Sequence, residues 1–149
     1  IIDTIGFNKL KLLNAFNLTI PGVPVIYYGD EIGMVGAGDP DNRRPMIFEG
    51  LNKYQEDIKK TIKQLFTLRA NNIALTYGEF NLIHISDNVF VYERIYLNNR
   101  VIVMFNKSEK TITLPDIYGI NYFKNHFNST TQNNQIVLSP YSFDIYTKQ

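Results

Sequence analysis

The sequence predicts an α+β fold in which a helix–strand–loop–helix unit of the repeating α/β type is followed by an antiparallel β-sandwich. Up to about residue 76, apolar residues recur at helical spacing on both sides of one continuous apolar segment. From residue 77 onward, short stretches rich in Val, Ile, Tyr, Phe and Thr are separated by Asn, Ser, Asp and Gly, which is typical of antiparallel strands. We therefore place a first domain at residues 1–76 and a second domain at residues 77–149.

The composition excludes several classes of function. A hydrophobic content of 44% against 19% charged residues is enough to form a core. Lys plus Arg number 15 against 14 for Asp plus Glu, so we expect no nucleic-acid partner. No apolar run approaches the roughly 20 residues of a membrane span, so we expect no membrane partner. Because the chain has no cysteine and only two histidines, we expect no disulfide, metal or cofactor in it; the lack of thiols leaves the compartment open.

Two elements are predicted before residue 29. Leu10, Leu13 and Phe16 recur at three-residue spacing within residues 7–19, which favours a helix packed along that side. Residues 23–28, Val-Pro-Val-Ile-Tyr-Tyr, are short, apolar and largely β-branched or aromatic. This pattern indicates a parallel strand that is buried on both faces.

A long loop separates this strand from a second helix. Residues 29–52 are rich in Gly, Pro, Asp and Asn without a sustained period, and loops of this length inside compact domains are usually functional. Asn52, followed three residues later by Gln55, is a helix start signal, and apolar spacing predicts a helix over residues 53–70. The solvated face of this helix is expected to carry Lys59, Lys60 and Lys63.

The second domain is predicted to consist of short antiparallel strands. The expected strands cover residues 89–96, 100–106, 111–114, 135–138 and 142–147. Asn98-Asn99 between the first two is a tight-turn signal, so these two strands should form a hairpin.

Two motifs carry a family resemblance. Residues 21–34 read Pro-Gly-Val-Pro-Val-Ile-Tyr-Tyr-Gly-Asp-Glu-Ile-Gly-Met, and residues 38–46 read Gly-Asp-Pro-Asp-Asn-Arg-Arg-Pro-Met. In this order and at this separation they resemble the eighth strand and following loop of the α-amylase family of glycoside hydrolases, in the variant of neopullulanases and cyclomaltodextrinases. Residues 5–19 are similar to the seventh barrel helix, residues 53–70 to the eighth, and the remainder to the C-terminal β-sandwich of that family.

The resemblance implies a C-terminal fragment of a retaining α-glucan hydrolase or transglycosylase, with the terminal βα unit of a (β/α)8 TIM barrel followed by the sandwich. In the family, three carboxylates act as nucleophile, general acid/base and transition-state stabiliser. The last of them lies in an Asn-His-Asp segment, which this chain lacks, so we expect no catalytic residue here and no activity of the chain alone. The implied partners are an α-glucan or maltooligosaccharide substrate and the rest of the barrel. A calcium ion in the missing part and self-association of the fragment are left open.

Two residues match sugar-binding positions of the family. Asp39 and Arg43 correspond to the Asp and Arg that bind sugar hydroxyls on the non-reducing side of the cleavage point. A carboxylate can accept hydrogen bonds from two hydroxyls, while a guanidinium donates in a fixed fork and braces the carboxylate. The competing interpretation is an ordinary ion pair in a surface loop, because Asp-Pro-Asp-Asn is also common turn composition. With the family match, we predict that Asp39 and Arg43 bind substrate.

Other polar and aromatic residues are expected to serve the structure. Neighbouring side chains of an extended segment point to opposite faces, so Asp30 and Glu31 should not flank one glycosidic bond and are assigned a structural role. Tyr27 and Tyr28 are assigned to the core. The two histidines lie in the sandwich region without ligand partners nearby in sequence.

Two alternative functions remain open. A non-catalytic carbohydrate-binding module would present a coplanar row of exposed aromatic side chains; the alternation from Phe90 to Tyr96 suits such a row and suits a core equally well. A purely structural, stabilising subdomain would have no affinity for glucan. For the barrel fragment that the resemblance implies, a barrel strand without its neighbours is expected to expose open edges.

Overall fold

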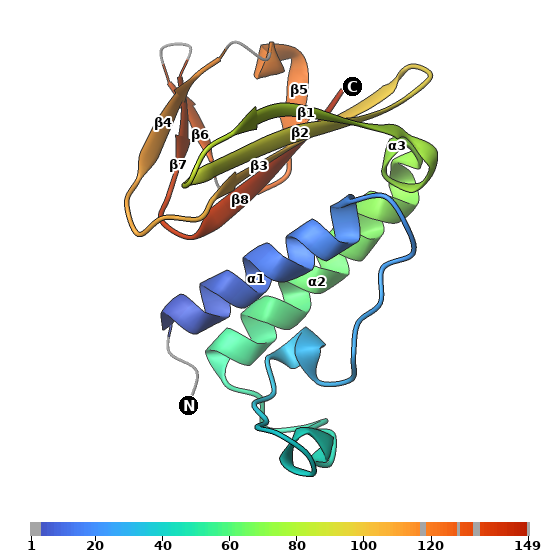
Figure 1. The fold of residues 1–149 in the computed structure, drawn as a ribbon, viewed down its shortest axis with the longest axis vertical. Helices are drawn as coiled ribbons and strands as arrows, with labels where there is room; N and C mark the ends of the chain where they lie inside the picture. Colours follow the sequence, from blue (N-terminus) through green and yellow to red (C-terminus); the bar gives the residue numbers. More distant parts are fainter. Residues whose placement is uncertain (1–3, 117–118, 128, 133–134, 149) are drawn as a thin grey trace.

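The chain folds into two helices packed on one face of a β-sandwich, as a computed structural model describes for residues 4–116, 119–127, 129–132 and 135–148 (Figure 1). Helices α1 (Thr4–Thr19) and α2 (Lys53–Asn71) lie side by side beneath a five-stranded sheet, and a three-stranded sheet covers its other face. The short helix α3 (Ile73–Tyr77) connects α2 to the first strand. The predicted α+β class is confirmed.

All strand pairs are antiparallel, with the order β1-β2-β3-β8-β5 in the larger sheet and β4-β7-β6 in the smaller one. The strands are β1 (Glu79–Ile85), β2 (Val89–Tyr96), β3 (Asn99–Asn106), β4 (Ile112–Pro115), β5 (Phe123–Asn125), β6 (Thr130–Gln132), β7 (Gln135–Leu138) and β8 (Ser142–Lys148). The five expected strands correspond to β2, β3, β4, β7 and β8 with shifts of one residue at their ends. The sequence pattern did not predict β1, β5, β6, α3 or the short 3-10 helix η3 (Ile120–Tyr122).

The predicted hairpin between β2 and β3 is confirmed, with its turn one residue earlier than expected. Tyr96 pairs with Asn99, so Leu97 and Asn98 form the turn. Leu97 takes a left-handed φ of 50° and leaves its side chain 83% exposed. This conformation is costly for a residue with a Cβ.

Two apolar cores lie on opposite faces of the five-stranded sheet. The helix-side core joins α1, α2 and α3 to side chains of β2, β3 and β8, including Tyr92, Val103 and Ile145. The sandwich core joins the other face of these strands to the smaller sheet through Val91, Ile102 and Ile136 among others. Because both faces are covered, the last six of the eight residues of β3 are buried without alternation. In β2, four of the eight residues are buried.

The aromatic alternation in β2 serves the helix-side core. Tyr92 is fully buried, and its hydroxyl lies 2.5 Å from the Thr19 hydroxyl oxygen at the end of α1. The half-buried Phe90 ring stands 6.1 Å from the ring of Phe16 on α1. The coplanar exposed row that a carbohydrate-binding module would use is therefore not formed by Phe90 and Tyr92.

Helix α2 begins where the sequence predicts. The Asn52 side chain accepts hydrogen bonds from the backbone N–H groups of Tyr54 and Gln55, and the Gln55 side chain accepts from the Asn52 backbone N–H, which completes a capping box. The buried side of α2 consists of Ile58, Ile62, Leu65, Leu68 and Arg69. Phe66 is 44% exposed, and the three lysines are exposed as expected.

Helix α1 packs only in part along the side that the spacing predicted. Its buried residues are Phe7, Asn14, Ala15, Leu18 and Thr19. Leu10 packs against the helix-side core, and the ring of Phe16, although 37% exposed, contacts Phe90 of the sheet. Leu13 is 62% exposed, so the expected packing is wrong for this residue. The reason is that neither α2 nor the sheet covers Leu13 in the described part of the chain.

The expected buried strand at residues 23–28 does not form. The segment is extended, but no described strand lies beside it, and a strand requires backbone hydrogen bonds to a neighbour. Val23 and Val25 are 90% and 77% exposed, so burial on both faces is wrong for this structure. Tyr27 and Tyr28 are 53% and 42% exposed, and their assignment to the core is wrong as well. In place of open strand edges, the segment exposes apolar side chains.

Two buried arginines fix the end of α1. Arg69 donates to the backbone carbonyls of Leu18 at 2.8 Å and Gly22 at 2.6 Å. Arg94, which is 1% exposed, donates to the carbonyl of Thr19 at 2.7 Å and to two carbonyls of the α3 region. Burial lowers the pKa of both guanidinium groups, yet both remain cationic at the negative end of the α1 dipole. The α2 helix, the sheet and the start of the 23–28 segment are thereby joined at one point.

Candidate functional site

The candidate site lies in the long connection between α1 and α2. Its first turn is formed by Gly29, whose φ of 92° suits glycine and whose carbonyl accepts from the Met34 backbone N–H at 2.9 Å. Between Gly29 and Met34 lies the 3-10 helix η1 (Asp30–Ile32), which buries Ile32 against α2. This turn anchors the connection to the helices, so that residues 35–48 project beyond them (Figure 1).

The projecting part carries the two residues that the sequence predicts to bind substrate. Arg43 ends the 3-10 helix η2 (Asp41–Arg43), and its Nε and Nη2 donate to Asp39 Oδ1 and Oδ2 at 2.7 and 2.6 Å. Both side chains are about 60% exposed, at 65% for Arg43 and 59% for Asp39. The structure therefore brings Asp39 and Arg43 together in a bidentate pair that faces solvent.

A second bidentate pair lies next to the first, and sequence reasoning missed it. Arg44 Nε and Nη2 donate to Asp41 Oδ1 and Oδ2 at 2.7 and 2.8 Å, and the Ala37 backbone N–H donates to Asp41 Oδ2. The hydrogen bond from Arg44, followed by the one from Ala37, lowers the pKa of the Asp41 carboxyl. The sequence did contain one signal, the three-residue spacing of Asp41 and Arg44. The composition of the segment is equally typical of a solvated loop in which these residues are not paired.

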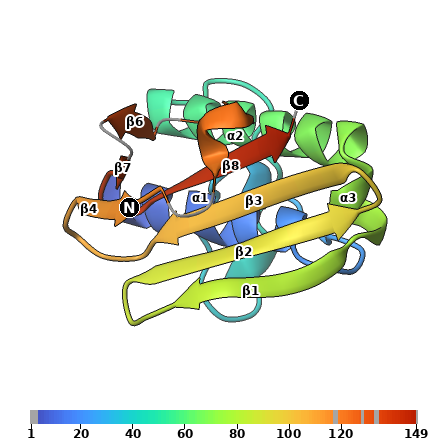
Figure 2. The ribbon, with the colours of Figure 1, turned by 90° about the horizontal axis from the view of Figure 1, so that it is seen from above.

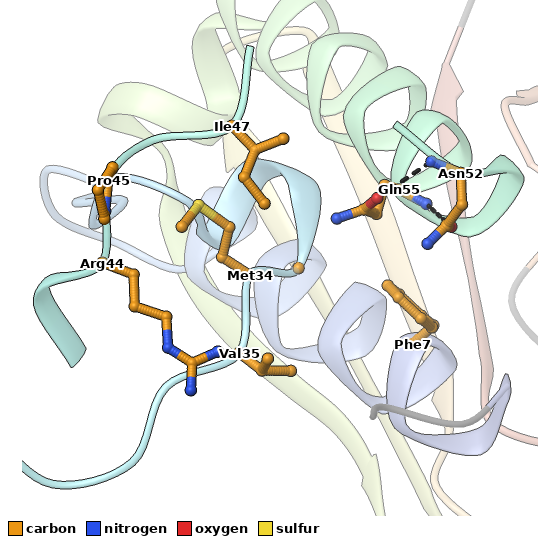
Figure 3. Close-up of a pocket in the computed structure, with 9 residues that line it drawn as sticks. Phe7, Met34, Val35, Arg44, Pro45, Ile47, Asn52 and Gln55 are labelled. Atoms are coloured by element: carbon orange, nitrogen blue, oxygen red, sulfur yellow. Dashed lines mark hydrogen bonds between the residues drawn. The ribbon is translucent and has the colours of Figure 1, made fainter. Parts of the chain in front are cut away.

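Arg44 lines two adjoining cavities, whereas Asp39 and Arg43 line neither. The larger, of about 300 Å³, lies between the loop and the helices and is mostly apolar (Figure 3). Figure 3 shows Arg44 extending toward Val35, with Phe7 on the helix side. The side-chain oxygens of Asn52 and Gln55, which border this cavity, accept the hydrogen bonds of the capping box. The polar groups that this cavity offers to a sugar are therefore mainly donors, the amide nitrogens of these two residues and the guanidinium of Arg44.

The smaller cavity, of about 210 Å³, is more polar. It is lined by Tyr27, Tyr28, Asp30, Met34, Val35, Gly36, Asn42 and Arg44. The two tyrosine rings lie 4.7 Å apart, and the Tyr28 hydroxyl donates to the Arg44 carbonyl at 3.1 Å. Burial, followed by the neighbouring Tyr27, raises the pKa of Tyr28, so its hydroxyl stays protonated at neutral pH. Aromatic faces beside a guanidinium and an amide are a suitable lining for a sugar ring.

The adjacent carboxylates at residues 30 and 31 have different environments. Glu31 Oε2 accepts from the Gly29 backbone N–H at 2.7 Å, which is the structural role expected of it. Asp30 borders the smaller cavity, where partial burial raises the pKa of its carboxyl. The two groups do not face each other across a common cavity, in agreement with their exclusion as an acid/base pair.

The two histidines lie outside this region. His84 is exposed on β1. The half-buried His126 lies 2.7 Å from the Thr147 hydroxyl through Nε2, and burial, followed by the charge of Lys124, lowers its pKa. Across the described residues, no three His, Asp or Glu side chains converge as a metal site. No helix in the described part of the chain has the length and hydropathy to cross a membrane.

Comparison with known proteins places these features in a family. The family model described as alpha amylase, catalytic domain, matches residues 3–74. The cyclomaltodextrinase of Thermoanaerobacter pseudethanolicus is 41% identical over 113 residues, which are 74% of this chain and 20% of that protein. The cyclomaltodextrinase of Geobacillus thermopakistaniensis is 34% identical over 147 residues, 93% of this chain and 25% of that protein.

Solved structures agree with these sequence matches. The maltogenic amylase from S. marinus superposes with a TM-score of 0.79 at 30% identity over 95% of this chain and 19% of that chain. The chain thus spans a fifth to a quarter of the length of these three relatives, which is consistent with the expected C-terminal fragment. Together with the two motifs around the Asp39–Arg43 loop, these matches show that the chain belongs to the α-amylase family of glycoside hydrolases.

Proposed function

We propose that this chain is part of a retaining α-glucan hydrolase or transglycosylase that acts on maltooligosaccharides, to which it contributes a substrate-binding loop and the C-terminal domain. The observation that carries the proposal is the exposed, bidentate Asp39–Arg43 pair on a loop that projects beyond α1 and α2. The names of the relatives, cyclomaltodextrinase and maltogenic amylase, support the substrate class.

The pair has the chemistry that sugar recognition requires. Each Asp39 oxygen uses one lone pair on Arg43 and keeps others for sugar hydroxyls. The guanidinium holds the carboxylate in one orientation, so the entropy cost of ordering it is met before substrate binds. The smaller cavity next to it, with Tyr27, Tyr28 and Arg44, is available for the adjoining part of a glucan.

The catalytic carboxylates are proposed to lie outside this chain. We expect no hydrolysis of maltoheptaose or β-cyclodextrin by the chain alone, because neither Asp30 nor Glu31 has a partner carboxyl across a shared cavity. If the purified chain hydrolysed these substrates and Asp30→Asn abolished the hydrolysis, the proposal that the catalytic carboxylates lie outside this chain would be contradicted.

The direct test is a hybrid enzyme in which this chain replaces the matching part of the Thermoanaerobacter pseudethanolicus cyclomaltodextrinase. In that hybrid, Arg43→Ala should lower kcat/KM on maltotriose by about 10- to 100-fold, mainly through KM, since it removes charge-assisted hydrogen bonds to substrate. Lys110→Ala, an exposed cation on the sandwich, is the matched control and should change kcat/KM less than about twofold. Unchanged KM and product lengths in Arg43→Ala would remove this residue from the site.

The two alternative functions are separated by calorimetric titration of the chain with maltoheptaose. Loss of binding in Arg43→Ala supports the proposed loop. Loss in Tyr77→Ala supports a carbohydrate-binding module, because Tyr77 and Tyr96 form an exposed ring pair 6.2 Å apart, whereas Tyr92 is buried. The purely structural role would be supported by two results together. The wild-type chain would not bind maltoheptaose, and in the hybrid enzyme Arg43→Ala would change kcat/KM no more than the control Lys110→Ala does.

A further inference from the structure

A groove of about 610 Å³ lies between α2 and the β5–β8 edge of the five-stranded sheet. Figure 2 shows α2 along the β8 side of the sheet, with β1 at the opposite edge. The lining of the groove includes Lys60, Lys63, Thr67 and Asn71 from α2 and Lys124 and Thr147 from the sheet. None of these residues borders the two cavities that Arg44 lines, so the groove is a separate feature of the surface.

Helical spacing explains which lysines of α2 reach the groove. Residues three and four apart lie on the same face of a helix, so Lys60, Lys63 and Thr67 form one row along α2. Lys59 lies about 100° around the helix from Lys60 and does not line the groove. The structure thus divides the lysines that the sequence pattern assigns to one solvated face.

Both walls of the groove carry positive charge without a compensating carboxylate. Lys60 and Lys63 stand on the α2 wall and Lys124 on the β5 wall, and no carboxylate of the described residues lines the groove. Within the described part of the chain, none of these three lysines forms an ion pair. Like charges at this spacing repel, and charges on two facing walls add to one positive potential between them. An anion bound between the walls would offset this repulsion.

His126 borders the groove and responds to its charge. Burial, followed by the charge of Lys124, lowers the pKa of the His126 imidazole. Its Nε2 lies 2.7 Å from the Thr147 hydroxyl, and its backbone carbonyl accepts from Gln64 Nε2 at 2.6 Å. These contacts join α2 to the sheet edge, so the separation of the two charged walls is set before any ligand binds.

Uncharged polar groups lie beside the cations. The Thr67 hydroxyl donates to the Lys63 carbonyl at 2.9 Å, and its oxygen can still accept a hydrogen bond. The exposed Asn71 amide forms no hydrogen bond within the described residues, so it can donate and accept. The volume of the groove is typical of small-ligand sites, which span about 300–1,000 Å³. The groove therefore suits an anion that is attached to a hydroxylated group.

A phosphate monoester matches three ammonium groups better than a carboxylate does. It carries about 1.5–2 negative charges at neutral pH and three terminal oxygens, so it can accept from both walls at once. We propose that the groove between α2 and β5 binds a sugar phosphate, with its phosphate on the three lysines and its sugar hydroxyls on Thr67 and Asn71. This site is separate from the proposed substrate-binding loop, which precedes the start of α2 (Figure 1), and it does not depend on the proposed function.

Nuclear magnetic resonance of the two histidines tests the binding directly. Glucose 6-phosphate, titrated at about pH 7.5 and constant ionic strength, should shift the imidazole resonances of His126 until they saturate. His84, exposed on β1 at the opposite edge of the sheet, is the internal control and should not shift. A bound phosphate offsets the charge of Lys124 and of the two lysines on the facing wall, so the pKa of His126 should rise in the complex.

The two parts of the ligand are tested separately. Glucose should cause no shift at the same concentrations, and inorganic phosphate should bind about tenfold more weakly than glucose 6-phosphate, because it makes no contact with Thr67 or Asn71. An affinity for inorganic phosphate or for glucose equal to that for glucose 6-phosphate would overturn the proposal. So would the absence of a saturable shift at His126 with both glucose 6-phosphate and glucose 1-phosphate.

Single substitutions of exposed residues test the two walls. Lys63→Ala and Lys124→Ala should each raise the Kd for glucose 6-phosphate about fivefold or more, because each removes a charge-assisted hydrogen bond. Lys59→Ala, on the same helix but outside the groove, is the matched control and should stay within twofold. Asn71→Ala should weaken the binding of glucose 6-phosphate and leave that of inorganic phosphate unchanged. Equal weakening by Lys59→Ala would reduce the effect to net charge and overturn the proposal.

Arg43→Ala separates this site from the substrate-binding loop. It should leave the Kd for glucose 6-phosphate within twofold. Loss of binding in Arg43→Ala without loss in Lys63→Ala would place the ligand at the loop and overturn the proposal. Because the readout is binding to the chain itself, a hybrid enzyme without activity would count against the proposed function and leave the sugar phosphate site standing.

Discussion

Replacing Arg94 by methionine should remove one of the strongest connections between the sheet and the helices. The Arg94 side chain is 1% exposed and donates three hydrogen bonds to backbone carbonyls: to Thr19 at 2.7 Å, Leu75 at 3.1 Å and Gly78 at 2.9 Å. Methionine fills a similar volume but donates nothing, so three carbonyl oxygens lose their partner in a region with little water.

The magnitude follows from these three contacts. Hydrogen bonds that involve a charged group contribute about 1.5–3 kcal/mol each, but removing the guanidinium also recovers the cost of burying it. We therefore expect the free energy of unfolding to fall by about 3–5 kcal/mol, a large part of the 5–15 kcal/mol that is usual for a domain. Arg94→Lys should lose less, because one ammonium can still donate to some of the same carbonyls.

The assay is equilibrium unfolding in urea, followed by far-ultraviolet circular dichroism. The control is Arg100→Met on the next strand, whose guanidinium pairs with Glu93 and is 35% exposed; that pair should contribute only about 0–1 kcal/mol. A loss below about 1 kcal/mol in Arg94→Met, or an equal loss in Arg100→Met, would refute the assignment of Arg94 as a structural connection.

Three further predictions concern the backbone and pH. Gly78→Ala should destabilise the chain by about 2 kcal/mol or more, because a Cβ would lie 2.3 Å from the Ala74 carbonyl oxygen; a urea midpoint equal to that of wild type would contradict this. Leu97→Gly should raise stability by about 0.5–1 kcal/mol, since it relieves a left-handed φ of 50°; a lower Tm would show that the turn is not strained. The pKa of His126 is lowered from 6.5, so the unfolded chain binds more protons there and stability should fall as pH drops below about 6.5. The urea midpoint, measured from neutral to acidic pH, should therefore decrease less in His126→Asn than in the wild type. An equal decrease in both proteins would exclude His126 as the source of the pH dependence.

The candidate site was only partly predictable. The pairing of Asp39 with Arg43 follows from motif spacing and is confirmed as a contact, while its role in substrate binding stays a prediction. The contribution of Arg44 to both cavities depends on how the loop brings Arg44 close to Met34 and Val35, which no local pattern encodes.

The sequence by itself determined the elements whose signals are local. The capping residues Asn52 and Gln55 determined where α2 begins, and the β-branched and aromatic runs determined the hairpin of β2 and β3, because these signals act between residues close in the chain. Only the tertiary structure decided which apolar residues are covered. The apolar pattern predicts that Leu13 and Phe16 pack against another element and that residues 23–28 form a buried strand. Whether they do so depends on which other segments lie beside them in the folded chain. Here α2 and the sheet cover one side of α1 and leave the other side open.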